Sequence, residues 1–205
     1  MFSYRAIVAH LKAMKGYFAF ATILFFAGMV VGGTNVQLES FMNSQIEGLR
    51  QLVDTAESSS NPGLAMFGII FLNNAVKSVV IMYLGVLFAV VPIFFMLVNG
   101  MVLGYLFTHM QPQQGTLFEL IAKGILPHGI IEIPALVVAC AYGIRFGILS
   151  FKGIGALFGK SPDLGKQYEA FVIRTVPIMV ILVVSLLLAA VIESTVTVWL
   201  VNTIN

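Results

Sequence analysis

Charged residues are scarce in this 205-residue chain, making up 10% of it, whereas apolar residues make up 59%. An ordinary soluble domain is roughly a quarter charged, so this sequence cannot cover a surface that faces water. Apolar runs of roughly the 20 residues that a helix needs to cross a bilayer recur along the chain. The sequence therefore predicts an integral membrane protein built of transmembrane helices.

The residues and motifs of several other protein classes are missing. The single cysteine, Cys140, lies in an apolar run and excludes an internal disulfide. There is no glycine-rich phosphate loop, Ser/His/Asp arrangement or Cys/His finger, and nothing supports nucleic-acid binding. The first apolar run has no small-residue cleavage site and further spans follow it, so we expect it to be retained.

The apolar runs predict an all-α fold, a polytopic bundle of about five transmembrane helices forming one membrane domain over residues 1–205. An amphipathic helix is expected within the polar segment 34–61. The stretch 63–91 is interrupted by Asn73, Asn74 and Lys77, so it is either one bent span or a surface helix followed by a span. The other predicted spans are 16–33, 93–110, 127–148 and 174–200.

The basic residues predict the orientation of the chain. Eight of the eleven lie either before the first span or between Arg145 and Arg174. Basic residues are retained on the cytoplasmic side, so the N-terminus and a basic loop at 149–173 are expected in the cytoplasm of a cell-membrane protein. The acidic 34–61 segment and the C-terminus are then extracytoplasmic.

Small residues recur at helical spacing in several spans. Such ridges let helix backbones approach closely, which matters because lipid provides no hydrophobic drive for helix association. They indicate either tight packing within the bundle or a seam between two copies in a homodimer. The ridges are Gly28 with Gly32, Gly100 with Gly104, and Ala135, Ala139, Gly143 and Gly147.

Polar side chains inside the spans are the most informative residues. An ionisable group at membrane depth costs a few kcal/mol or more, so it marks a functional site or a paired buried network. These residues are Asn73, Asn74, Asn99, His128, Glu132, Arg145 and Glu193. Arg145 lies near the cytoplasmic end of its span, where a side chain reaching the headgroups is the ordinary explanation.

Three of these residues are predicted to meet. His128 and Glu132 share a helix face, and Glu132 lies roughly 9 Å into its span at 1.5 Å per residue. Glu193 lies about equally deep, counted from Trp199 as an aromatic anchor at the outer interface. We therefore expect all three in the outer half of the bilayer, with the three asparagines extending the group inward.

Three hypotheses fit this group of polar residues. It is a satisfied hydrogen-bonded core, a divalent metal site or part of a proton or ion path. Imidazole and carboxylate ligands suit zinc best. In the metal hypothesis the ligands are His128, Glu132 and Glu193.

The order of these features resembles the stage II sporulation protein M family over nearly the whole chain. The block Pro127-His128-Gly129-Ile130-Ile131-Glu132-Ile133-Pro134-Ala135 is the most specific part. The other matching stretches are Phe71-Leu72-Asn73-Asn74, Asn99-Gly100-Met101-Val102-Leu103-Gly104, Gly143-Ile144-Arg145-Phe146-Gly147 and Ile192-Glu193-Ser194-Thr195.

For members in spore formers, the resemblance implies a non-catalytic scaffold, which we expect to be a homodimer. Such a member holds peptidoglycan-degrading partner proteins at the septal membrane during engulfment. The 34–61 segment is then a docking surface, or a helix that lies on the headgroups. Two alternatives remain: an intramembrane metal-dependent hydrolase, in which Glu132 is a ligand or the general base, and a small transporter or channel.

Overall fold

The computed structural model describes residues 4–109, 116–159 and 164–204. Within these residues all regular structure is helical. In chain order the elements are α1 (Tyr4–Ala13), α2 (Lys15–Thr34), η1 (Val36–Leu38), α3 (Glu39–Glu57), α4 (Pro62–Leu84), α5 (Val90–His109), α6 (Leu117–Leu120), η2 (Ile121–Ile125), α7 (Leu126–Phe158), α8 (Leu164–Ile192), η3 (Glu193–Thr197) and α9 (Val198–Val201).

Five helical stretches in the described part of the chain are long and apolar enough to cross a membrane, which confirms the predicted fold class. Their outer faces carry large exposed apolar side chains, such as Ile23 on α2, Val76 on α4 and Leu188 on α8. So much exposed apolar surface is a liability in water and the natural surface toward lipid. The chain is therefore a multi-pass membrane protein.

The uncertain stretch 63–91 is one span followed by a turn. The Asn61 side chain accepts a hydrogen bond from the backbone N–H of Leu64 at 3.3 Å and begins α4. The turn contains Phe88 and Ala89, both with positive φ. Pro92 lies in the first turn of α5, where its missing N–H is not needed. The sequence's first alternative, a single span, is correct.

The glycine ridges of α2 and α5 pack against each other within one chain. A Cβ on Gly32 would lie 2.0 Å from the Met101 carbonyl oxygen, and one on Gly104 would lie 2.0 Å from the Met29 carbonyl oxygen. A Cβ on Gly28 or Gly100 would lie 2.3 or 2.1 Å from the nearest backbone oxygen of the other helix. The two backbones therefore touch, and these glycines leave no surface to a second copy, so a homodimer seam on them is wrong.

The small residues of α7 also pack inside the bundle. Ala135 and Ala139 are buried beside Leu182 and Leu186 of α8. The end of α4 and the turn after it pack against Gly143 and Gly147. A Cβ on Gly147 would lie 2.2 Å from the Ala89 backbone nitrogen.

Of the predictions for the two segments outside the spans, 34–61 and 149–173, one is confirmed and one is wrong. A helix within 34–61 is confirmed as α3, which packs on α4 and α5 with its Asn43 Oδ1 accepting a 3.0 Å hydrogen bond from the Tyr105 hydroxyl. The basic loop at 149–173 is wrong as a loop, because α7 continues to Phe158 and α8 begins at Leu164.

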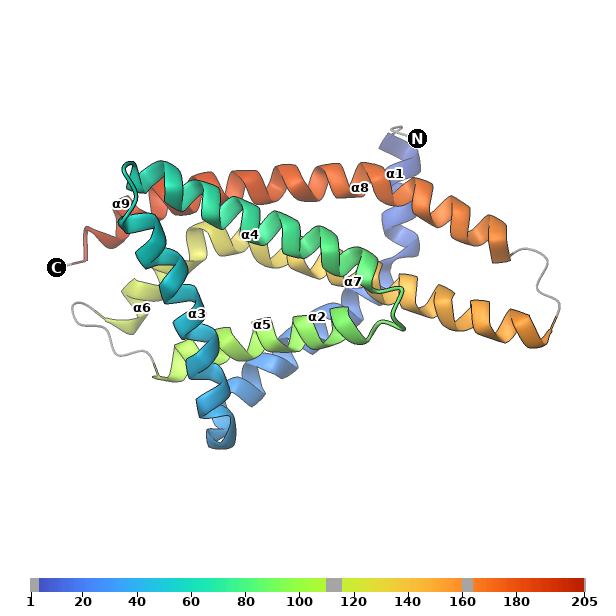
Figure 1. Cartoon of the computed structure of the whole chain (residues 1–205), viewed down its shortest axis with the longest axis horizontal. Helices are drawn as coiled ribbons and strands as arrows, with labels where there is room; N and C mark the ends of the chain where they lie inside the picture. The colour runs from blue at the N-terminus through green and yellow to red at the C-terminus, as the bar shows by residue number, and fades with distance from the viewer. Residues whose placement is uncertain (1–3, 110–115, 160–163, 205) are drawn as a thin grey trace.

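The bundle has two distinct ends along its long axis (Figure 1). α1, the C-terminal end of α7 and the N-terminal end of α8 lie toward one end, at the right of the picture. α6, α9 and the C-terminus lie at the other end, and α3 crosses the bundle near it. The two basic regions thus share an end, as the four spans between them require.

Candidate metal site

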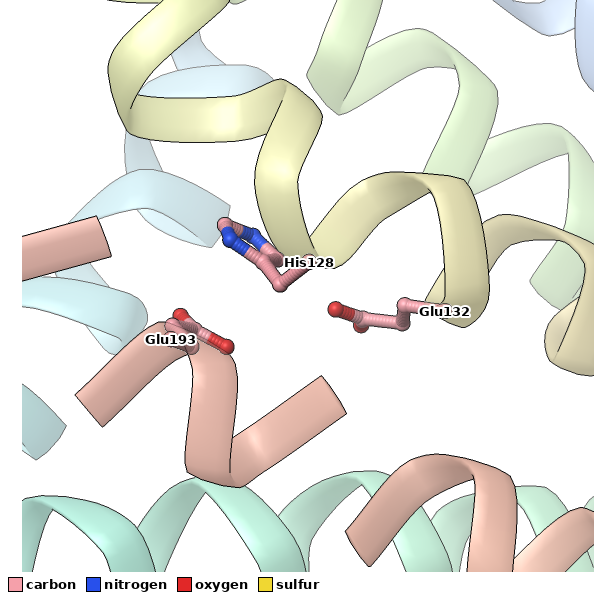
Figure 2. Close-up of side chains that lie close together, drawn as sticks. All are labelled: His128, Glu132 and Glu193. Carbon is pink, nitrogen blue, oxygen red and sulfur yellow. The ribbon is translucent and has the colours of Figure 1, made fainter. Parts of the chain in front are cut away.

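Three ionisable side chains meet near the end of the bundle that carries α9. His128 and Glu132 project from successive turns of α7, and Glu193 projects toward them from the start of η3 (Figure 2). One ligand atom from each side chain lies within 4.8 Å of the other two. The spatial meeting expected from their depths in the spans is therefore present.

Two π-helical turns flank this group, and neither was expected from the sequence. η2 immediately precedes α7, and η3 begins with Glu193 itself. Pro127 gives a reason for η2, because its ring clashes with the carbonyl of Lys123 in an ordinary α-helix and a wider turn relieves the clash. Such turns occur frequently at functional sites.

Neighbouring side chains orient two of the three groups. The Asn74 side-chain amide of α4 donates a 3.0 Å hydrogen bond to Glu132 Oε1, and Asn73 donates in turn to Asn74 at 3.3 Å. The Thr197 hydroxyl lies 3.3 Å from His128 Nδ1. Partners of this kind fix the orientation of metal ligands, and their loss weakens metal binding.

Glu193 differs from its two neighbours. Among the described residues no donor forms a hydrogen bond to its carboxylate, and no basic side chain forms an ion pair with it or with Glu132. A satisfied polar core requires partners for every member. Two half-buried carboxylates without a cation are instead the arrangement that a divalent cation would neutralise.

The other two polar residues predicted inside the spans lie outside this group. Asn99 donates to the Phe95 carbonyl of its own helix at 2.8 Å, so it needs no partner from another element. Arg145 lies 13 residues beyond Glu132, which is about 20 Å along α7. There it contacts Met14 Sδ at 3.2 Å and the Phe171 ring at 5.0 Å. The predicted buried polar network is therefore limited to Asn73, Asn74 and the three ionisable residues.

The geometry is compatible with zinc after small side-chain rotations. Zinc ligands lie about 2.0–2.2 Å from the ion, so tetrahedral ligand atoms lie about 3.4 Å apart. The spread of 4.8 Å or less is within reach of that value because carboxylate side chains rotate. Three protein ligands would leave a fourth position for water or another ligand.

Thr197 is the one contributor to the site that sequence reasoning missed. Threonine is ordinary in a transmembrane helix, and its spacing from Glu193 gave no signal by itself. Its place beside His128 depends on the π-turn that it closes.

Fold and site together define a multi-pass helical membrane protein with a cluster of histidine and glutamate between its last two spans. A family model described as stage II sporulation protein M matches residues 21–198, and the chain belongs to this family of sporulation-related membrane proteins. No curated protein and no solved structure gave a significant match.

Proposed function

We propose that this protein is a non-catalytic membrane scaffold that recruits peptidoglycan hydrolases to the septal membrane during engulfment. Family membership supports a role in sporulation. The polar surface near one end of an otherwise lipid-facing bundle supports a role in binding partners.

The observation that carries the scaffold proposal is the fixed position of α3. Met42 and Ala56 are fully buried against the bundle, and the hydrogen bond between Asn43 and Tyr105 holds the same helix. Its opposite face exposes Glu47 and Asp54. A polar face on a helix that packs against the bundle presents partners with a preformed surface, which lowers the ordering cost of binding.

The basic residues support an orientation for this surface. The positive-inside rule assigns the end with α1 to the cytoplasm, which makes α3 and the C-terminus extracytoplasmic. In that orientation α3 faces the cell wall, where peptidoglycan hydrolases act.

The metal site serves the scaffold in this proposal by joining elements. A zinc ion held by His128, Glu132 and Glu193 would connect α7 to η3, and Asn74 would connect both to α4. A metal ion held in this way would fix the end of the bundle that carries α3, and it would need no substrate path.

An intramembrane metal-dependent hydrolase is the second candidate function. The observation that favours it is the number of candidate ligands, which is three, because catalytic zinc sites have three protein ligands and keep the fourth position for water or substrate. A transporter has less support: apolar Leu182, Leu186 and Ala139 are buried between the site and Arg145, so the described side chains form no continuous polar path.

The proposed homodimer needs a surface other than the glycine ridges, because α2 and α5 occupy those ridges in each chain. Cross-linking of single cysteine variants on the lipid-facing side of α8, in membranes, tests it. We expect dimers from positions such as Val184, and a purely monomeric pattern would contradict the proposal.

Co-purification of peptidoglycan hydrolases from spore-forming cells tests the scaffold function. We expect Glu47→Lys with Asp54→Lys to abolish recovery of the hydrolases while the protein still reaches the membrane. Glu169→Lys is the matched control, because Glu169 is an exposed carboxylate toward the opposite end. Unchanged recovery with the double variant would contradict the proposal.

A hydrolytic assay separates the two candidate functions. Purified protein loaded with zinc is expected to leave peptidoglycan and membrane-peptide substrates intact. Cleavage that is lost with Glu132→Gln would favour the hydrolase over the scaffold.

A further inference from the structure

A second group of polar side chains lies toward the end of the bundle opposite the metal site. It consists of His10 on α1, Tyr142 and Arg145 on α7, and Arg174 on α8, and we refer to it as the Arg145 cluster. Three of its members surround one ring: the Phe171 centroid lies 6.2 Å from that of His10, 5.7 Å from that of Tyr142 and 5.0 Å from the Arg145 Cζ atom.

Two polar side-chain atoms in the Arg145 cluster are buried without a hydrogen-bond partner among the described residues. His10 is 6% exposed and Tyr142 is 0% exposed, and within residues 4–109, 116–159 and 164–204 neither the His10 Nε2 atom nor the Tyr142 hydroxyl has a hydrogen-bond partner. Buried polar groups without partners are rare, and each one needs an explanation such as an absent ligand.

The charge of the cluster is also uncompensated. The guanidinium of Arg145 contacts the Met14 sulfur and the rings of Tyr17 and Phe171, and no described carboxylate forms an ion pair with it or with Arg174. Burial lowers the pKa of His10, and the two nearby arginines lower it further. The cluster therefore combines positive charge with neutral donors and contains no anion.

The depth of the cluster in the membrane indicates where an anion would come from. Arg145 lies 17 residues beyond His128, about 26 Å along α7, and the hydrocarbon core is about 30 Å thick. Arg145 therefore lies near the headgroups of one leaflet when His128 lies near those of the other.

We propose that the Arg145 cluster binds an anionic phosphate group. The planar guanidinium of Arg145 suits two phosphate oxygens. The Tyr142 hydroxyl and the His10 Nε2 atom, if that nitrogen carries the proton, donate to the same group. Since α1 contributes His10, occupancy of the site also holds α1 against α8. A snorkelling arginine alone explains the position of Arg145 but leaves the two buried donors without a role.

A lipid titration of the full chain in uncharged detergent, followed by native mass spectrometry, tests this proposal. The probes are phosphatidylglycerol, phosphatidylcholine and inorganic phosphate, each added separately. We expect wild type to bind phosphatidylglycerol more tightly than phosphatidylcholine. Saturable binding of inorganic phosphate with no preference for phosphatidylglycerol would assign the site to free phosphate instead of a headgroup.

Substitutions within the cluster make the test specific. Arg145→Gln is expected to weaken binding of the preferred probe about tenfold or more, because hydrogen bonds to charged groups are the strong ones. Tyr142→Phe is expected to weaken it about threefold or more without lowering the stability of the empty protein, since the lost hydroxyl had no acceptor. A purely structural tyrosine would not give this combination.

Lys152→Gln is the matched control, because Lys152 is an exposed cation on the same end of α7. Equal losses of probe binding with Lys152→Gln and Arg145→Gln would indicate non-specific electrostatic attraction and overturn the proposal. Unchanged binding in both Arg145→Gln and Tyr142→Phe would overturn it as well. If Arg145→Gln does not fold, Arg145→Lys and Tyr142→Phe replace it, with the same requirement that binding weakens.

Discussion

The interface between α2 and α5 differs sharply from the one that joins α4, α7 and η3. In the first, glycines bring two backbones into contact, as Gly32 against Met101 illustrates. In the second, hydrogen bonds across the helices join Asn74 to Glu132 and His128 to Thr197, while the Glu193 side chain forms none with the described part of the chain.

The difference separates residues that build the bundle from residues available for chemistry. Close backbone contact stabilises a membrane bundle through packing alone. Ionisable groups in the same environment cost free energy, so the bundle has no structural need for them where small residues suffice. The first interface is therefore expected to respond to changes in shape and the second to changes in ligand chemistry.

The largest expected effect is a steric one at the α2–α5 interface. Gly32→Ala places a methyl group 2.0 Å from the Met101 carbonyl oxygen, and the helices must separate to admit it. We expect the free energy of unfolding to fall by about 3 kcal/mol, measured by denaturation with an anionic detergent. Gly68→Ala on α4 is the control, because a Cβ there meets nothing within 4 Å. Equal stability in both variants would contradict the packing role of the glycines between α2 and α5.

At the candidate metal site we expect the opposite pattern, a loss of metal binding without a loss of fold. Glu193→Gln removes a charged ligand, and we expect zinc affinity to fall about 100-fold, equivalent to about 2.7 kcal/mol. The metal-free variant should be at least as stable as wild type, because repulsion between two carboxylates is removed. Competition with a chromophoric chelator and an unfolding curve measure the two effects. A metal-free variant that unfolds more readily would assign Glu193 to structure.

A smaller effect is expected from the residue that orients Glu132. Asn74→Ala removes the donor to Glu132 Oε1 while leaving all three ligands in place. Loss of such a partner costs about 10-fold or more in metal affinity, and the same chelator competition measures it. The exposed neighbour Leu72 is the control position, since Leu72→Ala faces lipid. Identical losses in the two variants would contradict a specific role for the amide.

The smallest effect concerns pH and the docking of α1. His10 is buried beside Arg145 and Arg174, with Tyr142 and Phe171 packed against its ring, and its pKa is lowered mainly by burial. The folded state thus resists protonation of His10, so the neutral His10 ring contributes its full stabilisation above about pH 6.5. That stabilisation is lost as the pH falls from about 6.5 through the lowered pKa of His10. Amide hydrogen exchange of α1 should rise over that range in wild type and stay level in His10→Phe. Equal pH dependence of the exchange in both proteins would contradict this role of His10.

Much of the helix bundle could be predicted from the sequence because the patterns that specify it lie within single helices. The five spans depend on apolar length, and the glycine ridges on helical spacing. The meeting of His128, Glu132 and Glu193 followed from depth, since a membrane supplies a common axis along which residues can be counted. A soluble fold offers no such axis.

Features that depend on contacts between elements could not be predicted in this way. The helical ends of α7 and α8 replace an expected loop, and each end contacts another element: the Phe151 ring lies 4.7 Å from that of Phe88, and the Tyr168 ring lies 5.5 Å from that of Phe146. Asn99 was expected in the network but bonds to its own helix. The π-turn that brings Thr197 to His128 has no signature in residue spacing.

The most direct test of the central claim, that one divalent metal ion joins α7 to η3, is zinc stoichiometry. Elemental analysis of the purified full chain, dialysed against a small excess of zinc, gives the number of ions bound per chain. We predict one ion in wild type and none in folded His128→Ala or Glu132→Gln. A folded wild-type protein that retains no zinc, or variants that retain as much as wild type, would contradict the claim.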